Sequence, residues 1–449
     1  MKKNKQIDFA KKIHEYSPHF WLPSNEPIIN VNSNSWFNIQ EKNSNHLNNK
    51  FNAKLPIPQT KMIRYAEKIR IYPTKKQRRI LLNWMNSYIR MYNEALKFIK
   101  RRRIMKKSTI TNWKIMRTKH LKDIKANIIK KSAKVNAHVL DGAIQDVCSH
   151  LKSCITNLQN DNIKHFRLRY LKFSKKSKII KIENNCIKKD KTSFCPSVFK
   201  NKFILKKITN GKVEDFNLGN ITSSFYIHYN KDKNEFTLLN PIKTVPTKLH
   251  HNRDTISLDP GIRTFQTGYS TNKCVEIGTN LKSTIKKHLD KIDKIDKIDK
   301  IKNDDTINKR TKNKIKKKNY RKISNKIDDL HWKSINYLTK NYGNILIGNL
   351  STKSIVKKNN NIDKMTKRIG LLMRLYIFKQ RLAYKCERNK LSCNEIDEAY
   401  TSVTCTNCGF YKKDLGNSHI YNCDKCKHKI GRDFAGARNI LINSLKTKK

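Results

Sequence analysis

Hydrophobic and polar residues alternate with different periods along the chain, and the changes of period divide it into segments. Residues 64–72 alternate in a way that predicts a strand, which ends at Pro73. Thr74-Lys75-Lys76-Gln77 then has the Thr-x-x-Gln form of a helix-capping box. From there to about residue 165, apolar residues recur mostly at steps of three and four, which predicts lysine-rich helices. The apolar face of the first helix consists of Leu81, Met85, Tyr88, Ile89, Tyr92, Leu96 and Ile99.

Beyond these helices the period shortens. It falls toward two between about residues 166 and 250, where 225–229 and 235–239 flank Asp232-Lys233-Asn234 as the strands of a β-hairpin would. Residues 255–261 then predict a short buried strand that ends on a carboxylate and a turn. The later part of the chain mixes both patterns, with strands expected at 264–269 and 344–350 and helices at 328–340, 363–389 and 437–445. The sequence therefore predicts a multidomain α/β protein with a small all-β unit in its first half.

Two charged segments interrupt the later part. Residues 290–301 are an Asp-Lys-Ile repeat, and a period of three drifts by about 60° per repeat on a helix of 3.6 residues per turn. Ile292, Ile295, Ile298 and Ile301 therefore cannot hold one apolar seam, and we expect a solvated charged helix. The basic run 310–321 fits a phosphate-contacting arm, a nuclear localisation patch or a soluble face, and the sequence does not separate these.

Charge narrows the class of partner. The 449 residues include 98 Lys and Arg against 35 Asp and Glu, a net charge of +63, while 37% hydrophobic residues still suffice for packed domains. A protein with this positive charge favours a polyanion as its partner. Nucleic acid is the first candidate, because phosphates that are bound by Lys and Arg release condensed counterions. The first 61 residues, rich in Asn, Lys and Ser and broken by prolines, predict a disordered basic extension. No apolar run is long enough to cross a membrane, and no secretory signal opens the chain.

Cysteine spacing gives the sharpest single motif. We expect an intracellular, reducing compartment, the nucleus or another DNA-containing site, where close cysteine pairs indicate metal ligands before disulfides. Cys405-x-x-Cys408 is followed, after fourteen residues, by Cys423-x-x-Cys426. Two such turns supply four thiolates to one structural Zn²⁺, and the alternative is four unrelated buried cysteines. The other cysteines have no second metal spacing.

Acidic residues are scarce, so two that stand at element ends are candidates for catalysis. Asp259 closes an apolar strand, and Asp433 opens the last predicted helix in Gly431-Arg432-Asp433. Converging carboxylates in a protein that binds phosphates suit Mg²⁺, and a pair of such ions can activate water for phosphodiester cleavage. On the residues alone, each Asp could equally be a helix cap or an ion-pair partner.

The order of these pieces resembles the TnpB and Fanzor family of transposon-encoded, RNA-guided nucleases, relatives of type V CRISPR effectors. The resemblance spans about residues 62–445. Each matching segment alone is a modest indicator of the family, and the order in which the segments occur along the chain makes the resemblance specific. The matching segments are Tyr72-Pro73-Thr74-Lys75-Lys76-Gln77, Ser257-Leu258-Asp259-Pro260-Gly261-Ile262-Arg263, Phe378-x3-Leu382-Ala383-Tyr384-Lys385, Tyr400-Thr401-Ser402 through Cys405-x-x-Cys408-Gly409, and Gly431-Arg432-Asp433-Phe434-Ala435-Gly436-Ala437-Arg438-Asn439-Ile440.

The resemblance implies an RNase H-like (RuvC) nuclease domain with an inserted four-cysteine zinc ribbon, preceded by a β-barrel wedge domain and a helical recognition domain. Asp259 would be the first ligand of the catalytic Mg²⁺ or Mn²⁺ ions, and Asp433 the third. The implied layout is a wedge strand at 62–72, a recognition domain at 73–165, a wedge barrel at 166–250, and a nuclease domain at 251–449 with a charged helical insertion at 281–335 and the zinc ribbon at 401–430.

The second metal ligand departs from the commoner family pattern. Most members place a Glu at the end of the strand that corresponds to 345–350, where this chain has Gly348 and Asn349. Fanzor-like members resemble this sequence in having moved the Glu to the segment before Tyr-Thr-Ser, where Glu398 stands. In an RNase H-like sheet that segment would lie beside the strand that lost its Glu, so the resemblance implies a relocated ligand at Glu398.

Local rivals of Glu398 are Glu395 and Asp397. Each is an odd number of positions from Glu398, so in a strand both would point to the opposite face. Ala435, where many relatives have Asn, is a further departure and concerns a supporting contact rather than a ligand.

The resemblance implies an RNA-guided DNA endonuclease of a mobile element, a transposase in the family's nomenclature, whose partners are a guide RNA and target double-stranded DNA. The alternative is a nuclease-inactive relative that binds guide RNA and DNA without cleavage, which Gly348 and Asn349 motivate. A third interpretation is a zinc-bearing basic nucleic-acid binder without a guide. Trp84, Tyr88 and Tyr92 could stack on bases, but their helical spacing favours a core position. The sequence leaves the oligomeric state open.

Overall fold

The structure is a computed structural model that describes residues 2–23, 29–33, 38–43, 62–101, 110–132, 135–209, 212–247, 254–301, 308–350, 352, 356, 362–412, 416 and 418–445. The chain divides into two compact units. Unit 1 comprises residues 1–63 and 245–449, and unit 2 comprises residues 64–244. Among the described residues, no helix is both long and apolar enough to cross a membrane.

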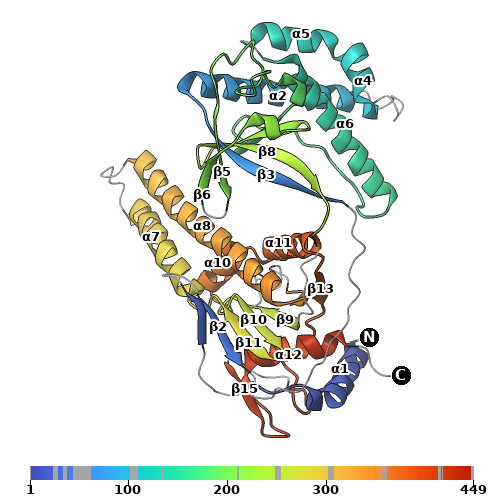
Figure 1. Cartoon of the computed structure of the whole chain (residues 1–449), viewed down its shortest axis with the longest axis vertical. Coiled ribbons are helices and arrows are strands. Elements are labelled where there is room, and N and C mark those ends of the chain that lie inside the picture. Colours follow the sequence, from blue (N-terminus) through green and yellow to red (C-terminus); the bar gives the residue numbers. More distant parts are fainter. Residues whose placement is uncertain are drawn as a thin grey trace. The chain divides into compact units, whose positions relative to one another are not determined.

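Unit 2 packs a helical layer on a six-stranded sheet with the order β4-β7-β8-β3-β5-β6. The helices and the sheet share one apolar core, in which Trp84 and Phe199 meet edge to face with ring centroids 5.1 Å apart. The strands are β3 (Ile63–Tyr72), β4 (Ser177–Ile182), β5 (Ile204–Thr209), β6 (Lys212–Asp215), β7 (Phe225–Asn230) and β8 (Glu235–Thr244), and the helices are α2 (Lys75–Arg101), α4 (Trp113–Ile115), α5 (Lys122–Lys131) and α6 (Ala137–Gln159) (Figure 1).

Local sequence explains how α2 begins. The amide of Gln77 donates to Thr74 Oγ1 at 3.2 Å, and the amide of Thr74 donates to Gln77 Oε1 at 2.9 Å, so the capping box satisfies two amides that lack helical partners. The expected apolar face of α2 is buried, and its aromatic residues Trp84, Tyr88 and Tyr92 belong to the core rather than to an exposed stacking surface. β7 and β8 form the predicted hairpin. Closure of the sheet into a barrel stays a prediction.

Unit 1 is built on a seven-stranded mixed sheet with the order β1-β2-β11-β10-β9-β12-β13. β12 is parallel to both β9 and β13, and the other pairings in the sheet are antiparallel. The strands are β1 (Ile29–Ser33), β2 (Asn38–Asn43), β9 (Thr255–Pro260), β10 (Gln266–Ser270), β11 (Lys273–Ile277), β12 (Asn344–Gly348) and β13 (Ser392–Ile396), and the helices are α1 (Lys2–Tyr16), α7 (Leu281–Ile301), α8 (Lys309–Asn341), α10 (Lys364–Met373), α11 (Leu375–Arg388) and α12 (Arg432–Ser444).

The two faces of this sheet are covered by different helices. Because side chains alternate along a strand, Ile256 and Leu258 point to one face and Ser257 and Asp259 to the other. The first face packs against α7, α8, α10 and α11 in one large core. The second face packs against α12 and α1, and the Ser257 hydroxyl donates to the carbonyl of Ala437 at 2.6 Å (Figure 1). The strand-end carboxylate of Asp259 therefore lies on the α12 face.

The N-terminal segment corrects the prediction of a disordered extension for residues 1–61. α1 packs beside α12, and residues 39–43 of β2 pair with β11, with Ile39 fully buried. The physical reason is that β2 gains its backbone hydrogen bonds from the edge of β11, so a polar strand with a single large apolar side chain can still be ordered. Residues 44–61 lie outside the described residues.

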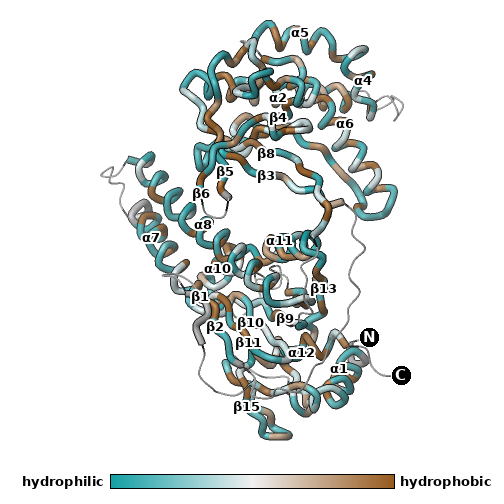
Figure 2. Tube along the Cα trace, viewed as in Figure 1, coloured by the Kyte–Doolittle hydropathy of each residue, from teal (hydrophilic) through white to brown (hydrophobic). Residues whose placement is uncertain are grey.

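The Asp-Lys-Ile repeat also differs from its prediction. α7 and α8 lie side by side as a helical hairpin, and Figure 2 shows α8 as mostly hydrophilic with interspersed hydrophobic residues. Ile292 is 1% exposed and continues a seam that starts before the repeat, at Leu281, Ile285 and Leu289. The prediction of a solvated helix is therefore wrong at Ile292, because the steps of four, four and three along this seam place it toward α8.

The helix expected over 363–389 is two helices. α10 ends and α11 begins at Arg374, whose φ of 52° lies in the left-handed region. A non-glycine residue in that region interrupts the helical hydrogen bonds, and the two halves can then pack in different directions. The Arg374 guanidinium pairs with Asp328 of α8 at 3.1 Å.

Candidate active site and cysteine cluster

Asp259 stands at the C-terminal end of the central strand β9, on the face covered by α12. A Cβ built on Gly436 would overlap Asp259 Oδ2, so glycine at this position of α12 leaves the space that the carboxylate occupies. Burial raises the pKa of Asp259 well above its usual range, the nearby carboxylates of Glu398 and Asp433 raise it further, and Arg432 opposes the shift. The structure thus gathers anionic groups around Asp259, which is the electrostatic setting of a cation site.

Glu398 follows β13, and β13 lies directly beside β12 in parallel register, with Gly348 opposite Ile396. A Cβ built on Gly348 would overlap the Glu398 carboxylate. The Glu398 side chain therefore occupies the volume that any side chain at the end of β12 would take. Among the described residues Glu398 Oε1 is buried without a hydrogen-bond partner, and burial raises the pKa of Glu398 to about 7.

Asn349 holds Glu398 in this place. The amide of Glu398 donates to Asn349 Oδ1 at 3.2 Å, and the Asn349 side-chain amide donates to Asp397 Oδ1 at 3.4 Å. The carbonyl of Glu398 accepts from the amide and the hydroxyl of Thr401, at 3.1 and 2.9 Å. From the sequence, Asn349 was only a position that lacks the carboxylate found in most family members. No local pattern indicated that its side chain binds the backbone of Glu398, 49 positions away.

The rivals of Glu398 point elsewhere. Glu395 pairs with Lys379 of α11 at 2.8 Å, on the opposite face of the sheet from Asp259. Asp397 pairs with Lys5 of α1 at 3.3 Å and accepts the amide of Ala399. Glu395 thus lies on the opposite face as predicted. Asp397 lies beyond the end of β13 and pairs with α1, which packs on the Asp259 face, so the predicted alternation does not extend to it.

Asp433 lies in the first turn of α12, where a carboxylate interacts favourably with the helix dipole. Its Oδ2 atom is 3.9 Å from the guanidinium of Arg263, which comes from the turn after β9. Of the described residues, the three carboxylates of Asp259, Glu398 and Asp433 are not gathered to the spacing of the cysteine cluster below. They are close enough for Glu398 and Asp433 to act on the charge of Asp259.

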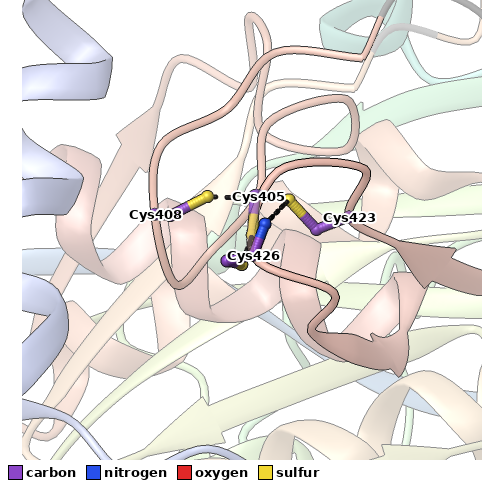
Figure 3. Close-up of side chains that lie close together, drawn as sticks. All are labelled: Cys405, Cys408, Cys423 and Cys426. Atoms are coloured by element: carbon purple, nitrogen blue, oxygen red, sulfur yellow. Dashed lines mark hydrogen bonds between the residues drawn. The ribbon is translucent and has the colours of Figure 1, made fainter.

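The four cysteines form a tight group (Figure 3). Their sulfur atoms all lie within 4.8 Å of one another, with Cys405 and Cys426 3.7 Å apart and Cys408 and Cys423 3.5 Å apart. A tetrahedral metal with bonds of about 2.3 Å to sulfur requires sulfur separations of about 3.8 Å. The thiols therefore fit one metal ion, and the sequence prediction of their grouping is confirmed.

Each cysteine turn uses a left-handed residue directly after its second cysteine. These residues are Gly409, with φ of 69°, and Lys427, with φ of 58°. At Gly409 an added Cβ would also lie 3.1 Å from the carbonyl oxygen of Ala10 in α1. Strands β14 (Ile420–Asn422) and β15 (Lys429–Gly431) flank the second turn, and β15 leads directly into α12. The cluster is thus held between the N-terminal helix and the helix that carries Asp433.

Comparison with known proteins agrees with this architecture. Three family models match the chain, namely a helix-turn-helix domain at residues 62–107, a probable transposase at residues 235–371, and a Cas12f1-like TNB domain at residues 376–440. In fold, the chain is similar to Cas12f1 in the cryo-EM structure of a Cas12f1-sgRNA-target DNA complex, with a TM-score of 0.51 and 14% identity over 82% of this chain and 83% of that one. The chain is thus similar in fold to this Cas12f1.

Sequence relatives narrow this similarity to a family. The chain is 34% identical over 399 residues to TnpB-like protein L770 of Acanthamoeba polyphaga mimivirus, which covers 85% of this chain and 73% of the relative. It is also 34% identical over 73 residues to the CRISPR-associated endodeoxyribonuclease Cas12f1 of Sulfoacidibacillus thermotolerans, over 16% of this chain and 17% of that protein. The chain belongs to the family of TnpB-like proteins.

Proposed function

We propose that this protein is an RNA-guided, divalent-metal-dependent DNA endonuclease of a mobile element, with Asp259, Glu398 and Asp433 as its catalytic residues. The observation that carries the proposal is the position of Glu398, whose carboxylate fills the space over Gly348 on the face of Asp259. A chain that had only lost its strand-end glutamate would have no reason to bury another carboxylate there, because it is costly to bury a carboxylate oxygen that, like Glu398 Oε1, has no hydrogen-bond partner among the described residues.

The residues fit a divalent cation. Glu398 Oε1 is buried and, among the described residues, has no hydrogen-bond partner, and hard cations such as Mg²⁺ take carboxylate oxygens as ligands. Asp259, Glu398 and Asp433 would hold one or two Mg²⁺ or Mn²⁺ ions, which when bound supply an activated water and stabilise the leaving oxygen of a phosphodiester. Gly436 and Gly348 leave room for the carboxylates, and Asn349 orients Glu398.

We assign the remaining parts of the chain in the same terms. The metal of the cysteine cluster is Zn²⁺, and its role is structural because four thiolates leave no open coordination position. The wedge domain, at 62–72 and 166–250, and the recognition domain, at 73–165, fall largely within unit 2, which comprises residues 64–244. Residues 251–449 form an RNase H-like (RuvC) nuclease domain. The net charge of +63 suits a guide RNA and a target DNA as partners, with the heteroduplex bound through its backbone.

A cleavage assay tests the proposal. The protein, purified with its copurifying RNA, is given Mg²⁺ and a plasmid library that matches this RNA and varies the flanking motif. Wild type should cut, and Asp259→Ala and Glu398→Gln should each lower the cleavage rate at least roughly 100-fold, which corresponds to about 2.7 kcal/mol. Glu395→Gln is the matched control, since it removes the same charge three positions away, on the opposite face of the sheet, and should cut normally.

Each of the other outcomes would assign a different function or a different catalytic residue to this protein. If wild type binds the matched DNA and never cuts, the nuclease-inactive relative is correct. If Glu398→Gln cuts like wild type while Asp259→Ala is inactive, the second ligand is another residue. If no RNA copurifies and binding ignores sequence, the protein is a basic nucleic-acid binder without a guide.

A further inference from the structure

Strand β2 brings a lysine to the sheet face that carries the proposed active site. In the pairing of β2 with β11, Lys42 lies opposite Cys274 and Gln40 lies opposite Glu276. Glu276 lies opposite Thr267 of β10, and Thr267 lies opposite Asp259 of β9. Directly paired residues of antiparallel strands share a face, so Lys42 and Glu276 point to the same side of the sheet as Asp259.

The surroundings of Lys42 tie it to the start of α12. Its ammonium lies 5.5 Å from the ring centroid of Phe434, the residue that follows Asp433. Glu276 is its diagonal neighbour across the strands, a distance that long side chains can span. Burial raises the pKa of the Glu276 carboxyl, the ammonium of Lys42 opposes this rise, and the carboxylate of Asp433 adds to it. Lys42 and Asp433 are therefore both electrostatic neighbours of Glu276.

We propose that Lys42 binds a phosphate of the DNA strand next to the phosphodiester that is cut, and that Glu276 and Phe434 position its ammonium. This inference rests on the proposed function, since it places the phosphate relative to Asp259 and Asp433. Glu276 adds a fourth carboxylate to those of Asp259, Glu398 and Asp433, and such a group repels a polyanion, so the substrate needs fixed cations at the rim of the site. Arg263 supplies one cation beside Asp433, and Lys42 supplies another from a strand at the opposite end of the sequence.

The alternative is that Lys42 and Glu276 form only a cross-strand ion pair. The two interpretations differ in what Lys42→Gln changes. If Lys42 binds a phosphate, Lys42→Gln loses a charge-assisted hydrogen bond to the DNA while folding stays nearly intact, because a partly exposed ion pair contributes little to stability, and Lys42→Arg keeps the charge. Lys11→Gln is the matched control, because Lys11 is exposed on α1 and belongs to the same N-terminal segment.

Two measurements on the full chain with its copurified RNA test the proposal. The first is the rate of Mg²⁺-dependent cleavage at limiting DNA, where Lys42→Gln should fall roughly 10- to 100-fold, the loss expected for one charged hydrogen bond, while Lys42→Arg and Lys11→Gln stay within about twofold of wild type. The second is the salt dependence of binding to single-stranded DNA with Ca²⁺ in place of Mg²⁺. The slope of log affinity against log salt should shrink by about 0.7 in Lys42→Gln, the value for one released counterion.

The outcomes separate this inference from the proposed function. If Asp259→Ala is inactive but Lys42→Gln cuts and binds with the wild-type slope, the lysine contact is wrong and the nuclease stands. If wild type does not cut, the nuclease is wrong, and the salt slope still decides whether Lys42 binds a phosphate. If Lys42→Gln lowers the melting temperature and cleavage in parallel while the salt slope stays at the wild-type value, the lysine is a structural ion-pair partner and the proposal fails.

Discussion

Gly348 has no side chain, and this absence gives Glu398 its place. The added Cβ of Gly348→Ala would overlap the Glu398 carboxylate and force it away from Asp259. We expect Gly348→Ala to lower cleavage at least roughly 100-fold, as loss of a metal ligand does, while the melting temperature changes by only a few degrees.

Gly142→Ala in α6 is the control for that substitution, since its added Cβ would meet ordinary contact at 3.8 Å. Wild-type cleavage by Gly348→Ala would mean that the carboxylate over Gly348 is not used. The double variant Gly348→Glu with Glu398→Gly, which returns the carboxylate to the end of β12, should cut faster than either single variant if the position of the charge is what matters.

His331 of α8 is buried between the rings of Phe265 and Phe378. Its Nε2 lies 2.9 Å from the carbonyl of Met373, and Arg381 donates to Nδ1 at 3.1 Å, so the ring is neutral with its proton on Nε2. Burial lowers the pKa of His331 from 6.5 to about 3, with the positive charges of Arg381 and Arg374 contributing to the decrease. The hydrogen bond to the carbonyl of Met373 and the carboxylate of Asp328 act in the opposite direction.

The sign of the resulting pH dependence follows from that depressed pKa. Below pH 6.5 the unfolded chain binds a proton at this position and the folded chain does not, so stability falls as the pH drops toward 3. Wild type should lose about 1.4 kcal/mol more per pH unit than His331→Gln in this window. Urea unfolding of both proteins between pH 6.5 and 4.5 measures the difference, and equal slopes would show that the histidine is already charged in the folded state.

At the scale of elements, the N-terminal segment is joined to α12 by one buried cation. Arg438 is 0% exposed, and its guanidinium donates to the carbonyls of Ser17 at 2.8 Å, Phe20 at 2.9 Å and Trp21 at 3.2 Å, as well as to Thr406 in the first cysteine turn. Backbone carbonyls and hydroxyls thus satisfy this charge. Deletion of residues 1–23 would remove most of these acceptors.

Deleting residues 1–23 should therefore destabilise unit 1 strongly, by about 3–5 kcal/mol, the cost of leaving a buried charge without partners. The same deletion made in Arg438→Met should cost less, with a coupling of about 1–3 kcal/mol, because the charge is then gone. Urea unfolding of the four proteins gives the coupling. Additive losses would mean that the segment stabilises unit 1 only through the apolar contacts of Phe9, Ile13 and Phe20.

At the scale of the whole molecule, the two units should respond differently to loss of metal. The cysteine cluster belongs to unit 1, where it packs beside α1 and α12. We expect one zinc ion per chain by elemental analysis, and Cys423→Ser should lower the melting transition of unit 1 by roughly 10 °C while that of unit 2 stays unchanged.

Cys148→Ser provides the matched control, because Cys148 is a buried thiol in the core of unit 2 and lies outside the cluster. It should bind zinc as wild type does. A full complement of zinc in Cys423→Ser, or an unchanged unit 1 transition after zinc is removed by a chelator, would contradict a structural metal at these thiols.

The sequence by itself determined the features that depend on neighbours along the chain. The capping box at Thr74 and Gln77, the buried face of α2, the hairpin of β7 and β8, and the grouping of the four cysteines all follow from period and spacing. These features rest on bonds and packing between residues a few positions apart, or on thiols whose spacing already matches a tetrahedral ion. The assignment of Asp259, Glu398 and Asp433 as catalytic stays a prediction.

Tertiary structure alone decided the features that depend on segments far apart. β2 is ordered because β11 completes its backbone hydrogen bonds, Ile292 is buried because α8 lies against it, and Glu398 reaches the Asp259 face because Gly348 leaves the space. None of these carries a local signal, since a polar strand, a charged repeat and a glycine predict exposure when taken singly. Burial and pairing are supplied by partners that lie from tens to more than two hundred positions away, and only the folded chain brings those partners together.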